Sequence, residues 1–103
     1  MDMKKMMKQA QKMQRDMAIA QEEIKKMEFE ATAGGGMVKV VALGDGELKS
    51  IEIAPDAVDP EDVEMLQDMV LVAVNEALRG VSDMASARMN AVTGGMGNMG
   101  LPF

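Results

Sequence analysis

Apolar and small side chains recur at alternating spacings of three and four along residues 1–27. This a/d spacing is typical of a helix that packs lengthwise against another helix. The seam consists of Met3, Met6, Ala10, Met13, Met17, Ala20, Ile24 and Met27. A helix docked on its own domain is also periodic, although its apolar stripe is usually wider and drifts towards about 3.6 residues per turn. The pattern therefore favours a coiled-coil-like pairing with a second helix, with docking within the domain as the alternative.

Between residues 29 and 53 the pattern changes to that of β-strands. We predict strands over 29–33, 37–43 and 47–53, rich in apolar and β-branched side chains. The glycines at 34–36 permit a tight change of backbone direction, and the Gly-Asp-Gly cluster at 44–46 is typical of a hairpin turn. Leu48 and Ile51 break strict alternation, so we expect a bulge or a one-residue offset near Lys49.

A second long helix is predicted after residue 59. Asp59 suits the N-cap and Pro60 the first helical position, and apolar residues then recur at helical spacing to about Val92. Gly80 marks a kink, a close contact or the end of the regular segment. The Gly- and Met-rich residues 93–103 are predicted to form a flexible tail.

These elements predict an α+β fold with a long N-terminal helix, a small antiparallel sheet of about three strands and a long C-terminal helix. Residues 1–92 would form one α-β-β-β-α domain with a projecting N-terminal helix, because 103 residues support one modest core. A dimer would add burial to a chain of this size, so we expect a homodimer.

Composition argues against an enzyme. The chain has no His, Cys or Tyr, and its carboxylates and lysines are not paired at a recognisable catalytic spacing. The acidic cluster at 56–64 misses the calcium-loop pattern, and the fourteen methionines are explained better by packing than by a soft metal. We therefore predict no catalytic residue, metal or cofactor. Because no signal peptide or membrane span is evident, a cytoplasmic protein is expected.

The charge is divided unevenly along the chain. The net charge is −6, yet residues 1–15 carry +4 and the remainder −10. The candidate DNA-binding residues are Lys4, Lys5, Lys8, Lys12 and Arg15. In the heptad register they occupy the b, c and f positions, which face away from the seam. One helix face would then contact protein and the other phosphate, although a basic face that contacts only solvent is the alternative.

The sequence resembles the YbaB/EbfC family of nucleoid-associated proteins along nearly its whole length. The resemblance is carried by MMKQAQKMQ at 6–14, GGGMVKV at 34–40, IEIAP at 51–55, EMLQD at 64–68, AVNEA at 73–77 and the closing LPF at 101–103. It implies a small bacterial homodimer that binds double-stranded DNA, lies in the cytoplasm on the nucleoid, organises the nucleoid and influences gene expression. The family has no fixed base-reading motif, so the assignment of DNA contact to the five basic residues depends on charge alone.

Contact through the phosphate backbone is favoured over base readout, because lysine is a mobile point charge and the only aromatics are Phe29 and Phe103. The alternative function is that of a protein-interaction adaptor, in which the heptad helix docks onto an acidic protein partner.

Overall fold

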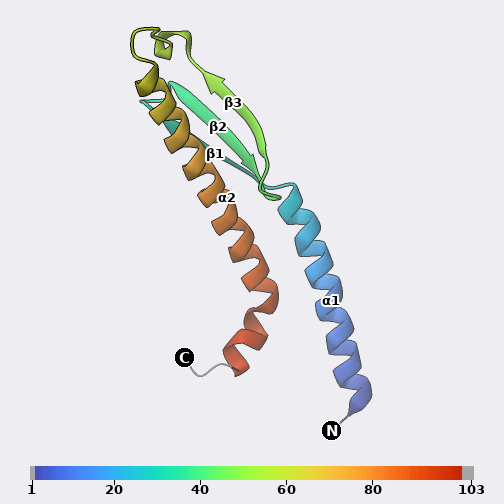
Figure 1. The fold of residues 1–103 in the computed structure, drawn as a ribbon. Coiled ribbons are helices and arrows are strands. Elements are labelled where there is room, and N and C mark those ends of the chain that lie inside the picture. The colour runs from blue at the N-terminus through green and yellow to red at the C-terminus, as the bar shows by residue number, and fades with distance from the viewer. Residues whose placement is uncertain (1, 101–103) are drawn as a thin grey trace.

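The computed structural model describes the backbone of residues 2–100 and the side chains of residues 2–93. The elements, in chain order, are α1 (Met3–Lys25), β1 (Glu28–Ala33), β2 (Val38–Leu43), β3 (Leu48–Ile53), the 3-10 helix η1 (Pro55–Ala57) and α2 (Val63–Gly100). The predicted α+β class is thereby confirmed, and the described chain is elongated, with extents of 72 × 28 × 15 Å. As Figure 1 shows, α2 lies along the sheet, and both helices continue beyond it at the same end.

The sheet is antiparallel, with the strand order β1-β2-β3. Gly34, Gly35 and Gly36 all have positive φ, so the first turn uses a backbone conformation that glycine adopts without strain. Between β2 and β3 the register shifts, because Ser50 pairs with Val41 whereas Leu48 pairs with Ala42. Lys49 is therefore the extra residue of a bulge, which confirms the offset predicted there.

The core lies between α2 and one face of β1 and β2. Its buried members are Ala31, Val38, Val40, Ala42, Ala73, Ala77 and Val81. Small residues on α2 allow the helix backbone to approach the sheet closely. No buried residue among those described is larger than valine; Val38 and Val40 are the largest fully buried side chains.

Gly80 lies at a close contact between α2 and β1. A Cβ atom placed on Gly80 would be 2.2 Å from Cε1 of the Phe29 ring. Gly80 does not end the helix, which is continuous through this position to Gly100. Of the three outcomes predicted for Gly80, the close contact is therefore the one that the structure contains.

Helix α1 packs on the part of α2 that extends beyond the sheet, and the two helices run antiparallel (Figure 1). Ala20 is completely buried, and Met13, Met17, Ile24 and Met27 are half-buried. The remaining seam residues, Met3, Met6 and Ala10, are exposed. The C-terminal part of the seam therefore docks within its own chain, as the alternative interpretation held, and the N-terminal part is left without a packing partner among the described residues.

One polar contact connects the two helices. Nε of Arg88 donates a hydrogen bond of 2.6 Å to Oε2 of Glu23. This hydrogen bond, more than the attraction of the charges, lowers the pKa of the Glu23 carboxyl below its usual value of 4.5.

Both ends of α2 differ from the prediction. The helix begins at Val63 rather than Pro60. The side chain of Asp59 accepts a hydrogen bond from the backbone N–H of Glu61 and so stabilises a turn before the helix. The side chain of Asp62 accepts a hydrogen bond from the backbone N–H of Met65 and caps the helix itself. It also continues past Val92 to Gly100, where a tail was expected. A helix that is already formed can extend through glycine, since extension avoids the cost of nucleation. The flexibility of residues 93–103 stays a prediction, and residues 101–103 lie outside the described residues.

The contact at Gly80 predicts the effect of a small substitution. Gly80→Ala should lower the free energy of unfolding by about 1–3 kcal/mol, because overpacking against Phe29 outweighs the gain in helix propensity of about 1 kcal/mol. Urea unfolding followed by circular dichroism measures the change. In the Phe29→Leu background the same substitution should cost less, and an equal cost in both backgrounds would show that the ring is not the obstacle.

The Glu23–Arg88 hydrogen bond predicts a pH dependence. Because the folded-state pKa of Glu23 is lowered, this interaction stabilises the fold above the usual carboxyl pKa, and its effect disappears as pH falls through the lowered value. Glu23→Gln should therefore reduce Tm slightly at neutral pH and make little difference in acid. Glu22→Gln is the matched control, since within residues 2–93 Glu22 pairs with Lys25 on its own helix and with no residue of α2. A larger loss of Tm for Glu22→Gln would contradict the assignment.

Candidate nucleic-acid interface

Helix α1 holds the five candidate DNA-binding residues in a fixed order along one rod. The helix starts at Met3 because the side chain of Asp2 accepts a 3.0 Å hydrogen bond from the backbone N–H of Lys4. From that start, the helical repeat fixes the direction of every later side chain. Lys4, Lys5, Lys8, Lys12 and Arg15 are all exposed.

Among the described residues, these five cations differ in their surroundings from four of the other six basic residues, whereas Lys26 and Arg79 also have no carboxylate within ion-pair distance. Lys25, Lys39, Lys49 and Arg88 each lie within ion-pair distance of a glutamate. Within residues 2–93, no such pair involves any of the five cations at the N-terminal end of α1. Their positive charge is therefore free to attract an external anion. Between Lys4 and Arg15 they span roughly 16 Å of helix, at about 1.5 Å per residue.

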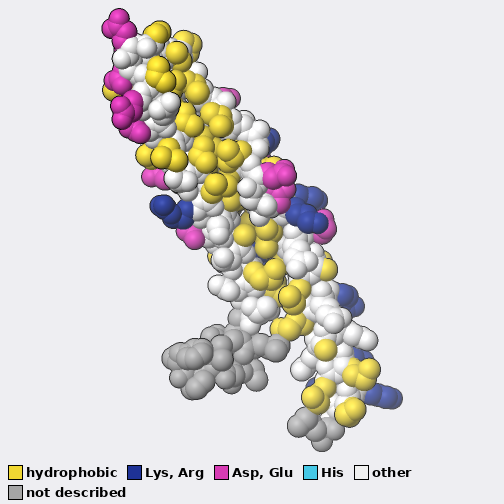
Figure 2. Space-filling view, in the orientation of Figure 1, with side chains coloured by type: hydrophobic (Ala, Val, Ile, Leu, Met, Phe, Trp, Pro, Cys, Tyr) yellow, Lys and Arg dark blue, Asp and Glu magenta, His cyan; other side chains and the backbone are white. Residues whose placement is uncertain are grey.

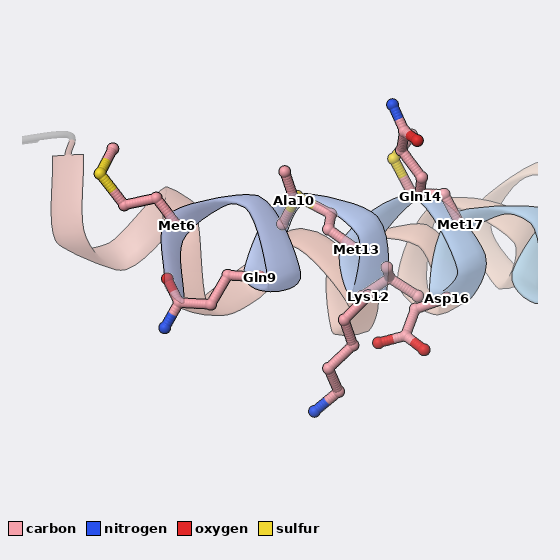
Figure 3. Close-up of a pocket in the computed structure, with 9 residues that line it drawn as sticks. Met6, Gln9, Ala10, Lys12, Met13, Gln14, Asp16 and Met17 are labelled. Carbon is pink, nitrogen blue, oxygen red and sulfur yellow. The ribbon is translucent and has the colours of Figure 1, made fainter. Parts of the chain in front are cut away.

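The apolar side of the same helix borders an open groove. The groove has a volume of about 730 Å³ and lies between α1 and the side chain of Val92 on α2. Seam residues Met6, Ala10, Met13 and Met17 line it, together with polar side chains at its edge. In Figure 3, Lys12 and Asp16 project to one side of α1 and Gln14 to the other. Lys12 lines this groove beside the seam residues, whereas Lys4, Lys5, Lys8 and Arg15 do not, so the basic face and the seam meet at Lys12.

Negative charge gathers at the other end of the molecule. The exposed acidic residues of η1 and the start of α2 are Asp56, Asp59, Glu61, Asp62 and Glu64. Figure 2 shows Asp and Glu at this end and Lys and Arg along the outer side of α1. A polyanion such as DNA would be attracted to α1 and repelled by the acidic end.

Two contacts that position α1 were not predicted from the sequence. Glu23 and Arg88 are 65 residues apart, and neither carries a local signal that would pair it with the other. The docking of Ala20 against α2 was likewise not predicted, because a heptad repeat indicates that a helix packs against another helix but does not identify which one.

Other kinds of site have little support in the described part of the chain. No group of three or more His, Cys, Asp or Glu side chains comes together there as a set of metal ligands. None of the described helices is both long enough and apolar enough to cross a membrane.

Comparison with known proteins gives a consistent result. The model of the YbaB/EbfC DNA-binding family matches residues 1–96. A protein named "Nucleoid-associated protein" from Pelotomaculum thermopropionicum is 60% identical over 100 residues, which cover 97% of this chain and 95% of the relative. A second protein with the same name, from Acetivibrio thermocellus, is 56% identical over 94 residues, covering 91% of this chain and 83% of the relative.

The fold also matches a solved structure. The crystal structure of the uncharacterized protein HP0035 from Helicobacter pylori superimposes with a TM-score of 0.70 at 27% identity, covering 94% of this chain and 99% of that one. The family that these comparisons indicate is one of DNA-binding proteins and not of enzymes. With a basic helix face, an α-β-β-β-α fold and a family match along almost its full length, the chain belongs to the YbaB/EbfC DNA-binding family.

Proposed function

We propose that this protein binds duplex DNA as a homodimer, largely through contacts from Lys4, Lys5, Lys8, Lys12 and Arg15 to the phosphate backbone. The observation that carries the proposal is that these five exposed cations lie along one helix with no carboxylate within ion-pair distance among the described residues. In the cell it would lie on the nucleoid in the cytoplasm, organise the nucleoid and influence gene expression. The names of the bacterial relatives support that location.

The chemistry of α1 favours contact that depends on phosphate and not on base sequence. A lysine ammonium is a compact charge on a flexible chain, and it lacks the planar fork with which arginine reads guanine. Four of the five residues are lysines. The helix would therefore bind duplexes of different sequence with similar affinity and with a marked dependence on salt.

The acidic end determines the proposed orientation. Phosphate would repel the carboxylates of η1 and early α2, so the molecule would approach DNA with the free end of α1 and keep its acidic end away. A homodimer would present two copies of α1 and so double the number of phosphate contacts. Because the binding free energies of linked sites combine, a dimer with two copies of α1 would bind DNA with much higher affinity than a single copy of α1.

Substitution of the four arm lysines tests the proposal. Lys4, Lys5, Lys8 and Lys12 are changed together to Gln, and binding to two unrelated duplexes of equal length is followed by fluorescence anisotropy at salt concentrations from about 50 to 200 mM. Affinity for both duplexes should fall by a similar factor. The slope of log K against log salt should become shallower by about 0.9 for each phosphate that the variant no longer neutralises.

The chain supplies a matched control, because its other four lysines are Lys25, Lys26, Lys39 and Lys49. Changing these four to Gln removes the same charge but leaves the proposed contact surface intact. Equal weakening by both quadruple variants would mean that net charge, and not the arm, governs binding. A strong preference of the unmodified protein for one duplex would contradict backbone contact. Binding seen only at very low salt would favour the protein-interaction adaptor instead.

A further inference from the structure

Methionine is the most readily oxidised residue type in this chain. The sequence has fourteen methionines and no Cys, Trp, Tyr or His, so the thioether sulfur is the group that a two-electron oxidant attacks first. Such an oxidant converts the apolar thioether into a polar sulfoxide. Because the oxidant must reach the sulfur atom, exposure limits which methionines react.

The most exposed methionines lie in two separate places. Met3, Met6 and Met7, here called the arm methionines, lie in the first two turns of α1 and are 73%, 52% and 59% exposed. Met65, near the start of α2, is 57% exposed. The other described methionines are half-buried, apart from Met84 at 38%. Exposure therefore directs oxidation mainly to the free end of α1 and to the start of α2.

These two places carry opposite charge. The arm methionines are interspersed with Lys4, Lys5 and Lys8, and within residues 2–93 none of these lysines lies within ion-pair distance of a carboxylate. Met65 directly follows the acidic residues at 61, 62 and 64. Figure 2 shows the acidic end of the molecule and, away from it, the basic outer side of α1. Thioethers of similar exposure therefore lie in electrostatic potentials of opposite sign.

Helical spacing brings Met7 closest to the basic face. At about 100° per residue, Met7 projects about 60° from Lys4, which lies one turn earlier, and about 100° from Lys8. A lysine ammonium on its flexible chain can therefore reach the space from which an oxidant approaches the sulfur of Met7. An anionic oxidant would be attracted to that space, whereas the carboxylates beside Met65 would repel it.

We propose that the arm methionines are a modification site, at which anionic peroxide-type oxidants form sulfoxide in preference to Met65. Peroxymonocarbonate, which forms from bicarbonate and hydrogen peroxide, belongs to this class. A sulfur lone pair attacks the outer peroxide oxygen, the O–O bond breaks, and the proton of that oxygen passes to the leaving bicarbonate. The sulfur loses two electrons and the peroxide gains them. Thiol-dependent reductases return sulfoxide to thioether, so the modification is reversible.

Bound DNA would protect this site from oxidation. This step rests on the proposed function, which places Lys4, Lys5 and Lys8 against phosphate. Phosphate neutralises the ammonium charges and itself repels anions, so the local concentration of an anionic oxidant falls. Sulfoxide would therefore form on protein that is free of DNA and not on protein that is bound to it.

Two oxidants of different charge test the proposal. The full chain is treated with neutral hydrogen peroxide or with the peroxymonosulfate anion, and tandem mass spectrometry follows sulfoxide at Met7 and Met65. With hydrogen peroxide the two residues should react at similar rates, because their exposures are 59% and 57%. With peroxymonosulfate at low ionic strength, the ratio of Met7 to Met65 oxidation should rise about tenfold. In about 1 M salt it should return to the hydrogen peroxide value.

The variant in which Lys4, Lys5, Lys8 and Lys12 are changed to Gln supplies the control. It should lose the preference of peroxymonosulfate for Met7 and keep its rates with hydrogen peroxide. Unchanged hydrogen peroxide rates at the half-buried Met13 and Met17 would show that α1 is still docked in the variant. Equal ratios for both oxidants in the unmodified protein, or a preference that survives in about 1 M salt, would overturn the proposal.

Addition of duplex DNA allows the two proposals to fail separately. Saturating duplex should slow the oxidation of Met7 by peroxymonosulfate and leave Met65 unaffected. If free protein shows the preference but bound duplex gives no protection, the modification site stands and DNA contact through the arm lysines is contradicted. If the preference is absent but duplex still protects Met7, the modification site is overturned and the proposed function stands.

Discussion

The width of a single helix governs the architecture of this protein. Because α2 is about two strands wide, it can bury one face of β1 and β2 but not of β3. The helix approaches the sheet closely because alanines and Gly80 form the contact, and the ring of Phe29 occupies the space that a side chain at Gly80 would fill. The result is a thin core of alanine and valine, and an apolar strand at the edge that a single chain does not cover.

The same helix also places the candidate DNA-binding surface. Beyond the sheet, α2 provides a platform on which the second half of α1 docks, with Ala20 buried and Glu23 bound to Arg88. The first half of α1 extends further and carries the five cations that have no ion-pair partner within residues 2–93. Rigid attachment at one end and exposure at the other would hold the cations at fixed spacing while leaving them accessible to phosphate.

Charge and apolarity divide the molecule in two different ways. Positive charge lies along the outer side of α1 and negative charge at the end formed by η1 and early α2. The uncovered apolar surface lies between them, on β3 and one flank of α2.

Local chemistry allowed much of this fold to be predicted. The strands were predicted to within about one residue, because glycines with positive φ delimit the first turn and alternation broke at Lys49, where the bulge lies. The a/d repeat likewise predicted α1, and the basic positions of that repeat are exposed as expected. These features depend on backbone preference and periodicity, which act over a few neighbouring residues.

Only the tertiary structure determines which residues of the α1 heptad repeat find a packing partner and what that partner is. The seam of α1 requires an apolar partner, but only the folded chain shows that Ala20 meets α2 while Met3 and Met6 do not. Asp59 and Asp62 both precede α2 and could each cap it, and in the folded chain it is Asp62 that does so. The pairing of Glu23 with Arg88 and the uncovered face of β3 also appear only in three dimensions. The sequence determined which segments become helix or strand and where charge lies, whereas contacts between distant segments depend on how much surface each element can cover.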